Sequence, residues 1–305
     1  WNGLFAGSGK APEIDNASDQ VKRGQYLVDV LGHCGECHTP RGLMFQTKAS
    51  KHHLGGAIVG GWYAPDISSD QSGIGQWSDD QLKNFVTHGK GARANAGGDM
   101  GLAVRMSLSK LPESDVDAMV AYLKATSPVV GLPEALIVDI PAPVDITRVE
   151  PRNTDYESFY SSDSTDGAAL YVAACATCHG VDGSLPDGAG PSLTQSRAVR
   201  AENAINVVQT VTQGINLVEL DRLTLMPSFR SEMTNAQIAA VSSYVRQRFG
   251  GIDSAVSAAE VESILGGRVG VPWIMLNARW LAWLGIVAAG MFALLLFLRS
   301  RTGKA

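Results

Sequence analysis

The stretch Cys34-Gly-Glu-Cys37-His38 recurs as Cys175-Ala-Thr-Cys178-His179, and the two copies contain all four cysteines of the chain. In a Cys-x-x-Cys-His segment both sulfurs can bond the vinyl groups of a porphyrin, and the adjacent imidazole can ligate its iron. The repeated stretch therefore predicts two covalently bound haem c groups. The cysteines Cys34, Cys37, Cys175 and Cys178 would attach them, and His38 and His179 would be metal ligands.

Two other kinds of site use the same cysteine spacing. Each Cys-x-x-Cys pair could form a redox-active disulfide, or the two pairs could share a four-thiolate zinc ion. A thioredoxin-like motif needs no histidine after its second cysteine, and a ribbon-type zinc site normally keeps its pairs closer in the sequence. Because the histidine recurs at the same offset and no cysteine is left over, the haem interpretation is favoured.

One stretch near the end of the chain is apolar on every face. Residues 280–298 read WLAWLGIVAAGMFALLLFL, nineteen residues without a charge. Such a helix would be about 28 Å long, against about 30 Å for the hydrocarbon core of a bilayer. Few buried helices of soluble proteins lack a polar face, and Trp273, Trp280 and Trp283 gather where an interfacial aromatic belt would lie. We therefore predict a transmembrane helix.

Charge predicts the orientation of this helix and excludes one class of partner. Arg299, Arg301 and Lys304 follow the span, so the positive-inside rule puts residues 299–305 in the cytoplasm and the bulk of the chain on the other side. The formal net charge of −5 argues against nucleic acid as a partner. No signal peptide is visible and the chain opens on Trp1, so we expect a processed or truncated start.

The body of the chain repeats one helical plan. Apolar segments over residues 21–30 and 168–174 lead into the two cysteine motifs. A helix over residues 111–123 closes the first copy, and a helix that begins at Thr234 closes the second. The Thr234 hydroxyl can pair with Gln237 in a capping box, which marks that helix start.

The predicted fold is mainly α, with two tandem cytochrome c-type haem domains and one C-terminal transmembrane helix. Glycine-rich domains of this size have little apolar core of their own, so each porphyrin would form a large part of its core. The expected bounds are 1–127 for the first cytochrome c domain with its N-terminal extension, 128–160 for a proline-rich connector, 161–250 for the second cytochrome c domain, 251–279 for a hinge and interfacial segment, 280–298 for the transmembrane helix and 299–305 for the cytoplasmic tail.

Methionine is the usual second axial ligand of an electron-carrying haem, because a neutral thioether favours Fe(II). In the second copy Met226, followed by a proline on the loop before the closing helix, is the predicted ligand, and Met233 is the alternative. In the first copy Met100 and Met106 both precede the closing helix, and their positions alone do not show which of them is the ligand.

The carbonyl of Pro191 could accept the N–H of His179, the second proximal histidine. Surface or hydrogen-bonding roles, not iron ligation, are expected for the histidines His52, His53 and His88.

Six longer stretches resemble the cytochrome c subunit of membrane-bound alcohol, aldehyde and sugar dehydrogenases. The resemblance extends from Trp1 to about Gly250. The stretches are Trp1-Asn-Gly-Leu-Phe5, Arg23-Gly-Gln-Tyr-Leu27, Gly32-His-Cys-Gly-Glu-Cys-His-Thr-Pro-Arg41, Gly61-Trp-Tyr-Ala-Pro-Asp-Ile67, Gly73-Ile-Gly-Gln-Trp77 and Met226-Pro-Ser-Phe229.

This resemblance implies a function, a location and further site residues. Subunits of that family take electrons from a dehydrogenase with a flavin, quinone or molybdenum cofactor and pass them to membrane ubiquinone or an oxidase. They are electron-transfer subunits of the bacterial inner membrane, with their bulk in the periplasm. Many carry three haems, and the segment at Trp1 resembles the lead-in to their second. The family pattern implies that Met100 is the axial methionine of the first haem. It also implies that four residues lie near the haem propionates, although ordinary packing is the alternative for the aromatic ones: Arg41, Trp62, Tyr63 and Trp77.

Two other functions fit parts of the sequence. A membrane-tethered dihaem shuttle, or a subunit of a terminal oxidase, would carry electrons without a dehydrogenase partner. A catalytic haem, as in peroxidases, would need an open or unusual sixth ligand position. Rapid binding of carbon monoxide by the reduced protein would indicate the catalytic alternative.

Overall fold

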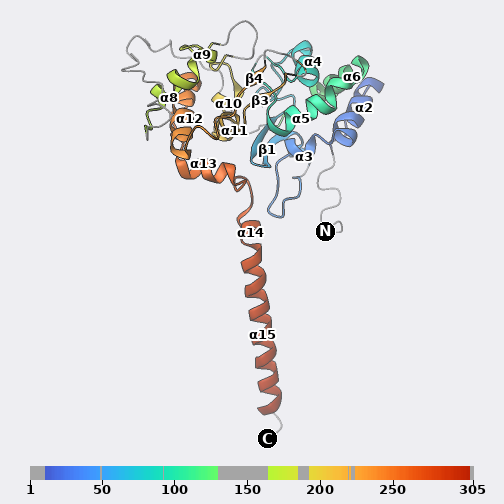
Figure 1. Cartoon of the computed structure of the whole chain (residues 1–305). Coiled ribbons are helices and arrows are strands. Elements are labelled where there is room, and N and C mark those ends of the chain that lie inside the picture. Colours follow the sequence, from blue (N-terminus) through green and yellow to red (C-terminus); the bar gives the residue numbers. More distant parts are fainter. Residues whose placement is uncertain are drawn as a thin grey trace.

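The computed structural model describes residues 11–48, 50–91, 93–129, 164–184, 192–218, 220 and 224–302. This part of the chain is mainly helical, with two short antiparallel hairpins, so the predicted helical fold is confirmed. A globular body stands at one end of a long C-terminal helix (Figure 1). The body has two hydrophobic clusters, and we call its described residues before 130 the first unit and those from 164 to 265 the second unit.

The first unit combines helices with one hairpin. Its strands pair antiparallel, with Ala57 opposite Ala64 and Val59 opposite Trp62. The predicted closing helix is present, capped by Pro112, and it turns its apolar side chains into the cluster. The elements are α2 (Asp19–Gln25), the π-helix η1 (Tyr26–Leu31), α3 (Gly35–His38), η2 (Ser50–His52), β1 (Gly55–Val59), β2 (Trp62–Asp66), α4 (Asp79–His88), α5 (Gly98–Met106), η3 (Leu108–Lys110) and α6 (Glu113–Ala125).

The second unit repeats the plan with a different hairpin. The predicted capping box is confirmed, because Thr234 Oγ1 accepts from the Gln237 N–H at 3.3 Å and Gln237 Oε1 accepts from the Thr234 N–H at 3.0 Å. Gly251 ends that helix in the left-handed region, at φ 68°. The elements are α8 (Gly167–Ala174), α9 (Ala176–His179), α10 (Arg197–Arg200), α11 (Ile205–Gln213), β3 (Ile215–Asn216), β4 (Leu225–Met226), α12 (Asn235–Gly250) and α13 (Ala258–Leu265).

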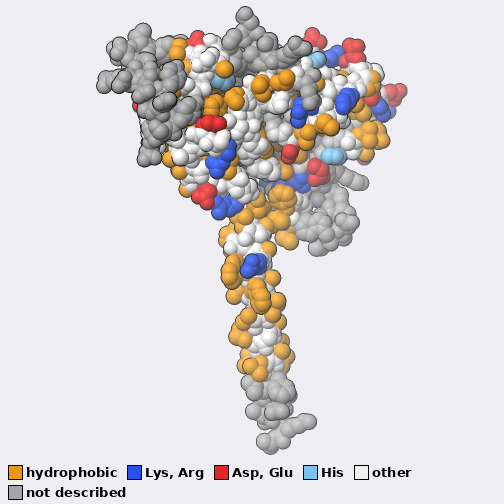
Figure 2. All heavy atoms as spheres, viewed as in Figure 1, with side chains coloured by type: hydrophobic (Ala, Val, Ile, Leu, Met, Phe, Trp, Pro, Cys, Tyr) orange, Lys and Arg blue, Asp and Glu red, His pale blue; other side chains and the backbone are white. Residues whose placement is uncertain are grey.

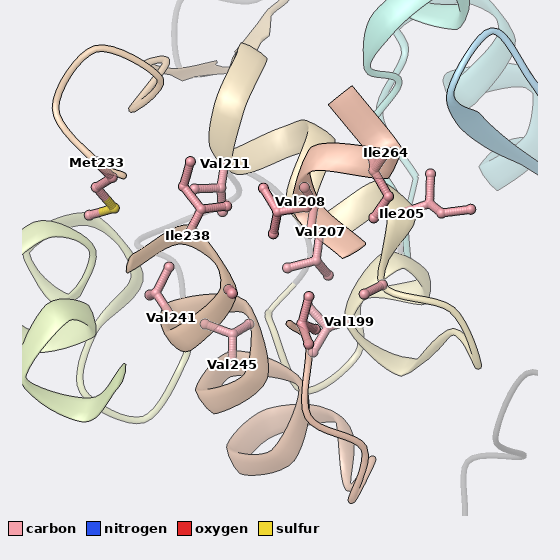
Figure 3. Close-up of a cluster of buried hydrophobic side chains, with 14 of the residues drawn as sticks. Val199, Ile205, Val207, Val208, Val211, Met233, Ile238, Val241, Val245 and Ile264 are labelled. Atoms are coloured by element: carbon pink, nitrogen blue, oxygen red, sulfur yellow. The ribbon is translucent and has the colours of Figure 1, made fainter. Parts of the chain in front are cut away.

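Part of the segment for which we predicted a hinge, residues 251–279, belongs to the second unit. Helix α13 packs against α11 and α12, and Val261 and Ile264 are at most 1% exposed. Figure 3 shows Ile264 directed at the same cluster as Ile205 and Val208. The predicted connector over 128–160 lies almost entirely outside the described residues.

A glycine allows the first helix of each unit to cross closely over α6 in the first unit and α12 in the second. A Cβ added to Gly24 of α2 would lie 1.9 Å from the carbonyl oxygen of Ala118 in α6, and one added to Gly167 of α8 would lie 2.4 Å from that of Ala240 in α12. A tyrosine follows four residues after each alanine and packs beside the same glycine. The two units therefore repeat one helix crossing, and the sequence analysis did not detect this part of the repeat.

Substitution of Gly24 by alanine should destabilise the first unit. The new methyl group would overlap the Ala118 carbonyl, so α2 and α6 would have to separate. Overpacking of this kind costs about 1–3 kcal/mol or more. We expect a clear drop in the melting temperature of the full chain, measured by circular dichroism in detergent. Gly290→Ala is the matched control, because nothing lies within 4 Å of its added Cβ; equal melting temperatures for the two variants would refute the close crossing.

Two helices follow the body. The short α14 (Trp273–Leu276) leads into α15 (Ala278–Thr302), where Ala278–Leu296 is long and apolar enough to cross a membrane. Its described side chains are exposed, for example Trp283, Ile286 and Leu295 at 57–63%. Figure 2 shows hydrophobic side chains along the described part of this helix. The helix begins two residues before the predicted start at 280. A membrane span explains this exposure better than a core helix does.

Candidate haem sites

Both cysteine motifs form a single helical turn. The amide of His38 donates to the carbonyl of Cys34, and that of His179 donates to the carbonyl of Cys175, each at 2.9 Å. One turn brings residues three and four apart to the same side of a helix. The two sulfurs and the imidazole of each motif can therefore reach one planar group.

The cysteines do not have the properties of the two alternative sites. All four are free, and burial raises the pKa of both Cys34 and Cys175 to about 12. A redox-active pair shows the opposite shift, towards an accessible thiolate. Within the described residues no three His, Cys, Asp or Glu side chains are grouped so that they could hold a metal ion, and therefore the four-thiolate zinc site is not formed.

His38 is oriented by a backbone carbonyl that was not predicted from the sequence. The Nδ1–H of His38 can donate to the carbonyl of Pro65 in β2 at 2.7 Å, which leaves Nε2 as the ligand atom. Burial lowers the pKa of this imidazole, and the neutral form is the one that binds a metal. Pro65 belongs to the quoted stretch from Gly61 to Ile67, but nothing in the order of residues indicates that it pairs with His38.

His179 shows a matching but incomplete arrangement. Burial lowers its pKa, and its buried Nδ1 has no hydrogen-bond partner among the described residues. Its predicted acceptor, Pro191, lies outside those residues. An unpaired buried imidazole nitrogen is costly, and the pairing of His179 with Pro191 stays a prediction.

The candidate axial methionines differ in their surroundings. Met226 lies on β4, partly buried against the second cluster, whereas Met233 is 5% exposed and belongs to the cluster itself (Figure 3). In the first unit Met100 stands in the first turn of α5 and is half-buried, and Met106 at the end of that helix is 62% exposed. Packing in the core explains the burial of Met233 without a ligand role. Met100 and Met226 therefore remain the predicted axial ligands.

The four residues predicted near the propionates have different environments. Trp62 packs over the glycines before Met100, Tyr63 is buried in the second cluster, and Trp77 is buried in the first, edge-on to Phe85 at 5.7 Å. Arg41 Nη2 lies 2.9 Å from Glu36 Oε2, and its buried Nε has no hydrogen-bond partner in the described part of the chain. Arg41 is therefore the member of this set best prepared to bind an anionic group.

Apolar side chains beside both motifs are exposed to solvent. Leu31 and Leu43 lie close to the first motif in the sequence at 57% and 76% exposure, and Val181 follows the second at 44%. A porphyrin at each motif would cover such side chains and gain apolar contact. The buried nitrogens of His179 and Arg41 that lack a partner among the described residues point the same way, so the residues present fit a haem at each motif.

Three polar side chains form a network beneath the first motif. Asp29 of η1 accepts a hydrogen bond from the Tyr122 hydroxyl at 2.6 Å and pairs with His53 Nε2 at 3.0 Å. His53 is 6% exposed and lies next to Gly35. It is thus a hydrogen-bonded histidine, as expected, while the exposed His88 bonds with Thr87.

Comparison with known proteins finds cytochrome c relatives. Residues 162–245 match the family described as cytochrome c oxidase, cbb3-type, subunit III. The chain is 36% identical over 267 residues to the fructose dehydrogenase cytochrome subunit of Gluconobacter japonicus, covering 84% of this chain and 54% of that protein. It is 31% identical over 278 residues to the gluconate 2-dehydrogenase cytochrome c subunit of Pantoea cypripedii, covering 87% and 60%. The chain is a homologue of dehydrogenase cytochrome c subunits.

This homology confirms the resemblance predicted from the sequence. A third relative, the cytochrome c subunit of the quinone alcohol dehydrogenase of Gluconobacter oxydans, is 28% identical over 93% of this chain and 60% of its own length. The cytochrome c domain over residues 162–245 implies covalently bound haem c. The chain spans 54–60% of the length of these three relatives.

Proposed function

We propose that this chain is a dihaem c-type cytochrome, the electron-transfer subunit of a membrane-bound dehydrogenase complex. The observation that carries the proposal is the repeated Cys-x-x-Cys-His turn, which in both units combines with an oriented or buried imidazole and a half-buried methionine. Each haem would supply one-electron exchange between Fe(III) and Fe(II). The chain would attach each porphyrin through two cysteines, ligate its iron with His38 and Met100 or with His179 and Met226, and exclude water from it.

The two methionine segments lie next to each other, which supports electron transfer within the chain. Helix α5, which carries Met100, contacts strand β3, and β3 pairs with β4 so that Ile215 faces Met226. A Cβ added to Gly97 would lie 3.8 Å from Ile215 Cγ1, and one added to Gly101 would lie 3.8 Å from Leu217 Cδ2. The segments that carry the two proposed axial methionines therefore lie close together, which would give electrons a short path between the two sites.

The apolar helix α15 would hold this body at the bacterial inner membrane. Its basic end would face the cytoplasm and the two units the periplasm, where they could receive electrons from a flavin, quinone or molybdenum dehydrogenase and pass them to ubiquinone or the respiratory chain. Two relatives are named as cytochrome subunits of fructose and gluconate dehydrogenases. These names support a dehydrogenase as the partner.

Purification of the native complex tests the proposal. In mild detergent we expect two haems per chain and a co-purifying dehydrogenase, identified by mass spectrometry and by its cofactor. A single haem per chain, or no dehydrogenase at any detergent strength, would contradict it.

A specific observation supports a second function. The matched family at residues 162–245 is described as an oxidase subunit, and the CcoP subunit of a cbb3-type oxidase from Cereibacter sphaeroides is 33% identical over 89 residues, or 29% of this chain. Co-purification with an oxidase in place of a dehydrogenase would favour that function. The dehydrogenase relatives cover much more of the chain, so we retain the first proposal.

A further inference from the structure

The outer edge of β2 is shared by the first haem motif and the second unit. One edge of this strand pairs with β1. In a strand, every second carbonyl points to the same side, and on the other side of this strand the carbonyls of Tyr63 and Pro65 both accept hydrogen bonds, as does that of Gly61 in the turn just before it. The donor to Pro65 is His38 Nδ1, whereas the donors to the other two come from the second unit.

Two carboxamides of α11 bind this edge. Asn206 accepts from the Tyr63 N–H at 3.0 Å and donates from Nδ2 to the Tyr63 carbonyl at 2.8 Å. It thereby supplies the donor and acceptor that a residue of a neighbouring strand would supply. Gln209, one turn later and 3% exposed, donates from Nε2 to the Gly61 carbonyl at 2.8 Å.

Other contacts hold the same strand against the second unit. The Tyr63 side chain is 5% exposed and belongs to the hydrophobic cluster of the second unit. Beyond the strand, the buried Arg197 of α10 donates to the Ser72 carbonyl at 2.8 Å, and its amide donates to the Arg93 carbonyl at 2.8 Å. Buried hydrogen bonds of this kind fix the relative position of two backbones, because breaking them leaves unpaired polar groups.

We propose that the second unit positions the hydrogen-bond acceptor of the first unit's proximal histidine, with Asn206 and Gln209 as the positioning residues. This inference rests on the proposed function, since it assumes a haem ligated by His38. The carboxamides hold Gly61 and Tyr63, and the strand transmits that position to the Pro65 carbonyl two residues further on. Pro65 has no N–H of its own to bind elsewhere, and its strand is held by β1 on one edge and by the two carboxamides on the other.

The consequence is a difference in redox behaviour between the two sites. A strong hydrogen bond from Nδ1 makes the imidazole more basic, and a more basic ligand stabilises Fe(III). Loss of the Asn206 contacts would let β2 move from His38 and would weaken that bond. The midpoint potential of the first site would then rise, whereas that of the second site would stay constant.

Redox titration of the full chain in detergent tests this inference. For Asn206→Ala we expect the midpoint potential of the first site to rise. At a fixed applied potential, its ratio of oxidised to reduced iron should fall roughly three- to tenfold, which is the change that one ordinary hydrogen bond supplies. The Nδ1–H proton resonance of His38 should shift in the same variant. The Met226→His variant identifies which potential belongs to the second site.

Two further variants keep the test decisive. Gln209→Met preserves the side-chain volume but removes the donor to Gly61, and we expect a smaller rise of the same sign. Asn235→Ala is the matched control, because the carboxamide oxygen of that half-buried residue accepts from Arg230, far from β2 in the sequence and within the second unit, and the substitution should change neither potential. Unchanged potentials in both α11 variants, or equal shifts at both sites, would overturn the inference. A wild-type chain without haem on Cys34 and Cys37 would instead refute the proposed function.

Discussion

Replacement of Cys175 and Cys178 together by serine is expected to reduce the chain from two covalently bound haems to one and to unfold the second unit. The thioether bonds are the covalent attachment, and serine cannot form them. The porphyrin would also cover exposed apolar side chains such as Val181, and a domain whose total stability is about 5–15 kcal/mol cannot lose so large a part of its core. Denaturing gels stained for haem, with pyridine haemochrome spectra, measure the ratio of haem to protein.

The controls for this change lie inside the same motifs. Thr177 stands exposed between the two cysteines, so Thr177→Ala should retain both haems. Replacement of Cys34 and Cys37 by serine should remove the other haem and leave the second unit folded. A full complement of haem in either cysteine variant would show that the corresponding motif is not an attachment site.

Replacement of Met226 by histidine is expected to lower the midpoint potential of the second site by roughly 0.1 V or more, within the range of about 0.8 V that axial ligands span. A nitrogen donor stabilises Fe(III) better than a thioether does, while the haem stays attached through its cysteines. Strand β4 is short and borders the cluster, so it can accept the new side chain. Potentiometric titration followed at the haem absorption bands measures the change.

Met233→Leu separates the two candidate ligands of the second unit. Met233 is buried in the cluster, and a swap of similar volume there costs less than about 1.5 kcal/mol. We therefore expect no shift of the potential and only a small loss of stability. The reverse result, a shift for Met233→Leu and none for Met226→His, would assign the ligand to Met233.

The sequence determined the features that depend on local order along the chain. The attachment and ligand residues of each motif lie within five positions, so their chemistry is visible without the fold. The cap at Thr234 and the apolar run over 280–298 are likewise local, because hydrogen bonding within a turn and transfer into a bilayer depend on neighbouring residues. The cap and the apolar helix have their counterparts in the structure, and haem attachment at the two motifs stays a prediction.

Only the tertiary structure decided which residues support these sites. The pairing of His38 with Pro65, the close crossing at Gly24 and the contact of Asn206 with Tyr63 join residues 27, 94 and 143 positions apart. A sequence shows such groups as an ordinary proline, glycine or asparagine, because their roles come from the neighbours that folding brings to them. The two carboxamides of α11 three positions apart on an apolar helix were the one local sign, since buried polar groups require partners.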